Sequence, residues 1–338
     1  MNEEISAKKW HYAAIIIVAG LLPLLMMFLD AQPSIGQMAL YMICSFIFLL
    51  TIFLILVPKV NTAFLNYLKE KTKIAVLLIG VVVLLPLLNW IFSTDIQAAV
   101  VSFSIWYLIP TVLLGIPYFV KNEKVKRFDF VFRVTAVLIY FAGFDLRYFA
   151  SINGFDGGSY EFVALWISAL ILVFMAVQDD NFIDKFNWQV TRNKLRISSN
   201  LLTILTVILL PIGFMTGFFV WNPQIDIENI LVGFIGIWLT IALPEEVVFR
   251  GVAQHQLTER APFKDKQRWK FIVLIIVSII FGLTHWNNTY AQFIWVYILL
   301  ASIAGIIYGI SWWRGGLFSA MFVHTLIDWV WALLFKLP

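Results

Sequence analysis

The feature that most limits what this chain can fold into is a series of long apolar runs. A run of about 18 residues or more spans the roughly 30 Å hydrocarbon core of a bilayer as an α-helix, and irregular backbone cannot face lipid. Charged residues make up only 13% of the chain, against about 25% in soluble domains. The sequence therefore predicts an all-α fold, a polytopic membrane helix bundle.

We expect about eleven transmembrane helices. They lie near residues 11–29, 37–57, 75–93, 98–119, 129–146, 161–178, 200–221, 229–258, 269–287, 291–312 and 316–335. Ionisable residues are rare in the spans before residue 200 and concentrate in the last third of the chain. We therefore expect an N-terminal region at 1–199, with about six helices, and a separate core at 200–338, with about five.

The basic residues indicate an orientation. Lysines and arginines cluster in the connections after the second, fourth, sixth and eighth spans, whereas the alternate connections carry mostly aspartate and glutamate. The positive-inside rule then places the N-terminus in the cytoplasm and the C-terminus on the outer side of a multi-pass protein of the cell membrane. The net charge of +4 belongs to these loops beside lipid, so we expect the bilayer as a partner and no nucleic acid.

Six ionisable side chains lie on the later spans: Glu245, Glu246, Arg250, His285, His324 and Asp328. A charge inside a bilayer costs at least ~2.5–3.5 kcal/mol, so such groups usually face a cavity and mark function. Glu246 and Arg250 are four residues apart and can pair on one helix face, as can His324 and Asp328. Glu245 is rotated by about 100° from Glu246. Three helices thus carry polar groups that can converge on one pocket.

Each group also has a purely structural interpretation. The Glu246–Arg250 pair can lock a helix, His285 can pack beside Trp286 at the interface, and His324 can be a buried partner of Asp328. Their joint occurrence in an apolar region favours a functional site.

Together these residues resemble the three-motif signature of the CPBP family, the CAAX protease and bacteriocin-processing (Abi) intramembrane peptidases. The motifs are Glu245-Glu246-x-x-x-Arg250, Phe281-x-x-x-His285 and His324-x-x-x-Asp328, in that order on successive spans. The resemblance covers residues 245–328 and implies a glutamate-type peptidase in which Glu245 and His285 activate water. The family pattern commonly has asparagine where this chain has Asp328.

The chemistry of peptide hydrolysis suggests a role for each residue. Glu245 is the candidate general base, and His285 holds the same water or donates a proton to the leaving amine. His324, supported by Asp328, faces the developing oxyanion. An ionised aspartate only accepts hydrogen bonds, so Asp328 acts through His324 or in its protonated form. Glu246 and Arg250 fix the helix.

Other mechanisms and functions stay open. Two histidines and a glutamate also form a zinc set, although no HExxH, GxSG or GxGD motif of other intramembrane proteases is present. We expect a metal-free site without a cofactor. The main hypothesis is an endopeptidase that cuts membrane-embedded or membrane-proximal peptides or proteins. The alternatives are a non-catalytic scaffold for peptide binding or bacteriocin immunity and, less favoured, a transporter, in which both halves would carry polar groups.

Convergence of the motifs requires a departure from straight helices. Glu245 lies near the middle of the eighth span, whereas His285 lies near the outer end of the ninth. Tilted helices, a broken helix or a different start of the ninth span would each provide it. Pro244 removes a helical hydrogen bond and is the candidate position for a break in the eighth helix.

Overall fold

The computed structural model describes residues 108–120, 128–145, 190–259, 267–286 and 291–337. The spans expected near 11–29, 37–57, 75–93 and 161–178 lie outside these residues, as does the first part, 98–107, of the span at 98–119. The chain forms two compact units, Met1–Ile183 and Asp184–Pro338. Each unit is described by itself.

Two helices of the first unit are described. They are α6 (Ile109–Phe119) and α8 (Asp129–Asp145), which pack against each other. Helix α8 coincides with the span expected at 129–146, even though that span carries a charged residue one turn from its start. The charge is accommodated because Arg133 Nε lies 2.8 Å from Asp129 Oδ1, so that the guanidinium is paired within its own helix.

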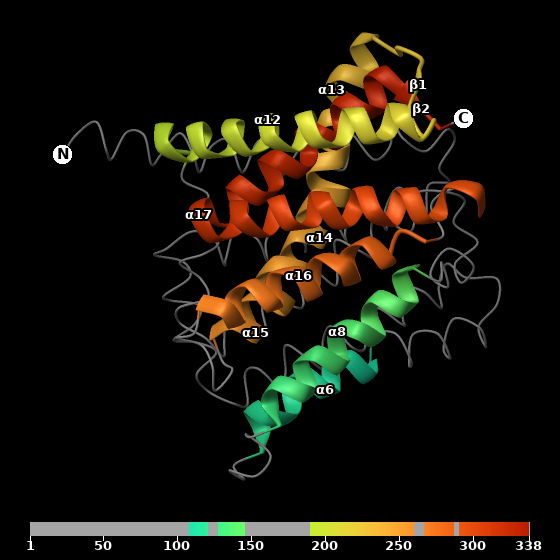
Figure 1. Ribbon diagram of the computed structural model, residues 1–338. Helices are drawn as coiled ribbons and strands as arrows, with labels where there is room; N and C mark the ends of the chain where they lie inside the picture. Colours follow the sequence, from blue (N-terminus) through green and yellow to red (C-terminus); the bar gives the residue numbers. More distant parts are fainter. Residues whose placement is uncertain (1–107, 121–127, 146–189, 260–266, 287–290, 338) are drawn as a thin grey trace, which may run out of the picture. The chain divides into compact units, whose positions relative to one another are not determined.

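The described part of the second unit is mainly helical (Figure 1). Its α-helices and strands are α12 (Arg192–Met215), β1 (Val220–Trp221), α13 (Ile227–Gly236), α14 (Leu243–Glu246), α15 (His255–Glu259), α16 (Gln267–Leu283), α17 (Ile294–Leu334) and β2 (Phe335–Lys336). A 3-10 turn, Ala291–Phe293, leads into α17. Helix α17 packs against α12, α13, α14 and α16 and forms the centre of the unit.

Helix α12 begins eight residues before the span expected at 200–221. The Thr191 side chain caps it by accepting a hydrogen bond from Lys194 N at 3.2 Å, which satisfies one of the free donors of the first turn. The mostly polar residues 192–199 therefore form the first turns of the same helix as the apolar residues that follow. Within the described residues, α12 and α17 are long and apolar enough to cross a membrane.

Helix α17 reverses direction at Gly316. That residue has φ 73° and ψ −163°, a conformation open essentially only to glycine. Tyr308 and His324 would lie about 24 Å apart on a straight helix, yet their rings stack with centroids 4.4 Å apart. The reversal divides α17 into two halves that coincide with the two apolar runs expected at 291–312 and 316–335, and Figure 1 shows the second half turning back from the first.

The helix that carries the glutamates does not break at Pro244, contrary to the expectation from the sequence. Residues 227–259 are helical throughout, but the winding changes. The π-helical segments η2 (Ile237–Ala242) and η3 (Val247–Gln254) flank the single α-turn α14. A change of winding accommodates the missing N–H of proline without interrupting the helix.

Aromatic side chains close the end of the unit at which α12 and α17 finish. β1 pairs antiparallel with β2, with Val220 opposite Lys336. The Phe218 ring lies in an adjacent cluster, 5.3 Å from the Tyr297 ring and 6.1 Å from the Trp331 ring. This cluster ties the loop after α12 to both halves of α17.

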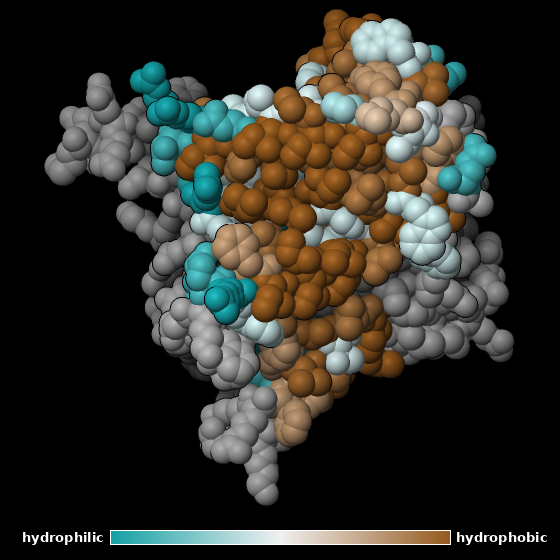
Figure 2. All heavy atoms as spheres, viewed as in Figure 1, coloured by the Kyte–Doolittle hydropathy of each residue, from teal (hydrophilic) through white to brown (hydrophobic). Residues whose placement is uncertain are grey.

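One side of α16 is both apolar and exposed. Its exposed isoleucines recur at intervals of three to four residues, whereas Val273, Val277 and Phe281 on the other side are buried. The exposed members are Ile272, Ile275, Ile276, Ile279 and Ile280. Figure 2 shows a broad hydrophobic surface over α12, α16 and α17, with hydrophilic residues gathered where α12 and α16 begin. Such a band is the surface expected of helices in lipid.

Candidate active site

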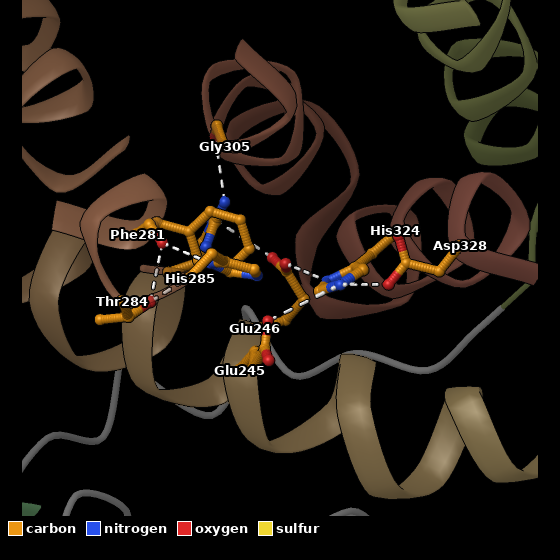
Figure 3. Close-up of polar contacts among 9 residues, drawn as sticks. Glu245, Glu246, Phe281, Thr284, His285, Gly305, His324 and Asp328 are labelled. Carbon is orange, nitrogen blue, oxygen red and sulfur yellow. Dashed lines mark hydrogen bonds and ion pairs between the residues drawn. The ribbon is translucent and has the colours of Figure 1, made fainter. Parts of the chain in front are cut away.

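The predicted site residues come from three parts of the second unit (Figure 3). Glu245 and Glu246 lie on α14 and Arg250 on η3, His285 follows the end of α16, and both His324 and Asp328 lie on the second half of α17. The structure brings five of the six together through direct ion pairs, and His285 lies beside them.

His324 is the centre of the network. Its Nδ1 lies 2.8 Å from Glu246 Oε1. Its Nε2 lies 3.2 Å from Asp328 Oδ2 and 3.7 Å from Glu245 Oε2. A neutral imidazole donates from only one nitrogen, whereas an imidazolium donates from both. Three carboxylates around one ring therefore favour the cationic form.

Glu246 and Arg250 form the fully buried part of the site. Both side chains are 0% exposed, and Arg250 Nε lies 3.2 Å from Glu246 Oε2. Arg250 Nη2 also donates to the Gly305 carbonyl at 3.0 Å. The guanidinium lies 4.6 Å from the centroid of the Phe281 ring and 5.3 Å from that of Tyr308, a cation–π arrangement. Glu246 thus joins a fixed cation to the imidazole.

Glu245 is held less firmly than its neighbour. Its side chain is 14% exposed. Its Oε2 is buried and has no hydrogen-bond partner among the described residues. Asp328 is more open than Glu245, with 34% of its side chain exposed. The two groups nearest to His324 Nε2 are therefore the ones that an incoming substrate can approach.

His285 contacts the network through an aromatic ring. The Phe281 ring centroid lies 4.8 Å from that of His285 and 6.0 Å from that of His324. His285 Nδ1 lies 2.8 Å from the Phe281 carbonyl oxygen. A carbonyl only accepts hydrogen bonds, so Nδ1 carries the proton and Nε2 of a neutral ring is an acceptor.

Several partners of the site could not be seen in the motifs. The Glu246–His324 hydrogen bond joins residues 78 positions apart, whereas helical spacing predicts only the pairing of Glu246 with Arg250. Tyr308, which stacks on His324, and Gln254, which donates to Gly309 O at 3.1 Å, belong to no motif. The only indication of Gln254 in the sequence is its position two helical turns after Glu246.

The zinc alternative depends on which imidazole nitrogens are free to bind a metal. No three His, Cys, Asp or Glu side chains are grouped to hold a metal ion in the described part of the chain. Zinc binds a neutral imidazole through a free lone pair. Both nitrogens of His324 face carboxylates, and Nδ1 of His285 faces a carbonyl. Nε2 of His285 therefore keeps a free lone pair, and the steps proposed below use only the protein's own side chains and water.

The comparisons with known proteins agree with the three motifs. Residues 227–330 match the family model described as type II CAAX prenyl endopeptidase Rce1-like, a range that includes all six predicted residues. No curated protein and no solved structure gave a match. Residues 227–330 thus match an Rce1-like type II CAAX prenyl endopeptidase domain, which is consistent with the predicted CPBP membership.

Proposed function

We propose that this domain is an intramembrane endopeptidase that hydrolyses membrane-embedded or membrane-proximal peptides with a water molecule activated by Glu245. The match of residues 227–330 to an endopeptidase family supports the reaction class. The single observation that carries the proposal is the arrangement around His324, with Glu246 on one ring nitrogen and both Glu245 and Asp328 at the other.

Glu245 is the proposed general base. Glu246 is tied to both His324 and Arg250, whereas Glu245 Oε2 has no hydrogen-bond partner within the described residues and the side chain is partly open. It accepts a proton from water while the water oxygen attacks the scissile carbonyl carbon. His285 orients the same water through Nε2, the nitrogen that does not face the Phe281 carbonyl.

His324 is the proposed donor to the oxyanion. As the C–O bond forms, negative charge develops on the former carbonyl oxygen, and a preorganised cationic donor stabilises it. Glu246 holds Nδ1 and thereby directs Nε2 toward the open side, where the oxyanion competes with Asp328 for the Nε2–H. Glu245 then passes its proton to the leaving nitrogen as the C–N bond breaks, which gives a carboxylic acid and an amine.

The proposed substrate follows from the environment of the site. The reactive groups lie within an apolar helical unit whose outer face carries exposed isoleucines, so a peptide reaches them from the bilayer or from its edge. The description of the matched family names prenyl endopeptidases. A prenylated peptide is therefore one substrate to test beside an unmodified membrane peptide.

The test is proteolysis in reconstituted membranes by wild type and by Glu245→Ala at equal folded yield, with and without a chelator. We expect wild type to cut, the variant to be inactive and the chelator to have no effect. Equal cleavage by both proteins would exclude Glu245 as the base. Peptide binding without cleavage by either protein would instead support the non-catalytic scaffold.

A further inference from the structure

One buried side chain outside the three motifs holds the helix on which both glutamates lie. Gln254 is 1% exposed and lies two turns after Glu246. Its Nε2 donates to the Gly309 carbonyl at 3.1 Å. One turn nearer to the glutamates, Arg250 donates to the Gly305 carbonyl at 3.0 Å. Donors and acceptors are both four residues apart, so the two bonds run in register along the two helices.

The two acceptor glycines allow the helices to approach closely. A Cβ atom on Gly309 would lie 2.5 Å from Gln254 Oε1 and would collide with Leu274. A Cβ atom on Gly305 would lie 3.2 Å from Ser278 on α16. A carbonyl has two lone pairs, so each glycine oxygen can accept a side-chain donor besides its bond within the helix. The close approach of α17 to η3 at these glycines therefore lets side chains of η3 donate hydrogen bonds to the glycine carbonyls.

The winding of η3 explains why this helix needs to be held. Val247–Gln254 is π-helical, a form that is rare and is found mostly as single turns at functional sites. A return to α-winding would rotate the residues before η3 relative to those after it. Glu245 and Glu246 would then turn away from His324. Arg250 anchors the middle of this segment and Gln254 anchors its end.

We propose that Gln254 is a positioning residue, which binds the Gly309 carbonyl, fixes the winding of η3 and so directs both glutamates at His324. The kinetic part of its test rests on the proposed function. Gln254 does not contact the reacting atoms, and its effect on the reaction passes through the helix.

The chain offers a matched control for the substitution. Gln256 is also 1% exposed, but neither of its amide atoms has a hydrogen-bond partner among the residues that the structure describes. Gln254→Met is expected to lower kcat about 10- to 100-fold with little change in KM, because a misplacement of about 1 Å can cost 10²-fold. Gln256→Met is expected to leave both constants unchanged.

A second measurement reports on the environment of His324 and does not require catalysis. The chain has four histidines, so ¹⁵N NMR of imidazole-labelled protein resolves His324, with assignment from a His324→Asn sample. Gln254→Met is expected to shift the His324 signal, and Gln256→Met is expected to leave it in place. Loss of stability alone would lower the unfolding midpoint without moving that signal. Where Gln254→Met does not fold, Gln254→Asn, whose amide is too short to reach Gly309, replaces it.

The outcomes separate the two proposals. An unmoved His324 signal and wild-type kcat in the Gln254 variant would overturn the positioning role, as would an equal loss from the Gln256 control. An inactive wild type would refute the proposed function. The His324 signal would still decide whether Gln254 positions the glutamates.

Discussion

Replacement of each of the two adjacent glutamates by glutamine is expected to affect a different property, stability for Glu246 and cleavage for Glu245. Glu246 is 0% exposed and is the ion-pair partner of Arg250, which is equally buried. Removing one partner of a buried pair costs about 3–5 kcal/mol, because the other charge stays buried without compensation. The aromatic rings around Arg250 offset part of this cost, so we expect Glu246→Gln to lower the free energy of unfolding by about 3 kcal/mol.

Glu245→Gln provides the comparison. Glu245 Oε2 lies 3.7 Å from His324 Nε2 and forms no hydrogen bond within the described residues. Removing a weakly paired carboxylate from an apolar unit is therefore expected to leave stability unchanged or slightly raised while abolishing cleavage.

The assay for both variants is reversible unfolding in mixed micelles titrated with a denaturing detergent. Addition of Arg250→Met to Glu246→Gln should recover most of the lost stability, because the uncompensated charge is removed. Equal destabilisation by the two glutamine variants would refute the distinction between a structural and a catalytic glutamate. So would a Glu246→Gln variant of wild-type stability.

Four further predictions concern the rest of the unit. Asp328→Asn is expected to retain cleavage within about tenfold in kcat, since an amide oxygen can still accept from His324, whereas Asp328→Ala should lose more; steady-state kinetics decide this. Gly316→Ala should cost about 1–3 kcal/mol and reduce cleavage, because its φ of 73° is strained for alanine; the same detergent titration measures it. Gly309→Ala should cost about 1–3 kcal/mol through overpacking, whereas Gly236→Ala, where a Cβ meets nothing within 4 Å, should be neutral or stabilising by up to about 1 kcal/mol. A reporter fused to the C-terminus should be active on the outer side of the membrane, and activity in the cytoplasm would reverse the predicted orientation.

The sequence predicted those parts of the site that depend on local spacing. The pairs Glu246–Arg250 and His324–Asp328 were expected from their i,i+4 separation, and both are ion pairs in the structure. The reversal of α17 was expected as a boundary between two apolar runs, where Gly316 now supplies the required backbone conformation. Residue spacing along one helix and the limits of apolar runs are local features of the sequence, so they predict these parts of the structure.

Contacts between helices and the type of winding could not be predicted in the same way. The hydrogen bond between Glu246 and His324 joins residues 78 positions apart. The spacing of apolar residues along the chain does not specify which carboxylate contacts which ring nitrogen. The π-helical segments around Pro244 replaced the expected break, because winding depends on tertiary contacts such as that of Gln254 with Gly309. The early start of α12 was missed because its first turns are polar.

The most direct test of the central claim is a single-turnover cleavage of a membrane peptide in H₂¹⁸O, with enzyme in excess and product analysed by mass spectrometry. Direct attack by a water held at Glu245 predicts one ¹⁸O atom in the new carboxyl group, no covalent peptide–enzyme species, and no incorporation by Glu245→Gln. A peptide bound covalently to the enzyme, or wild-type incorporation by Glu245→Gln, would contradict the account.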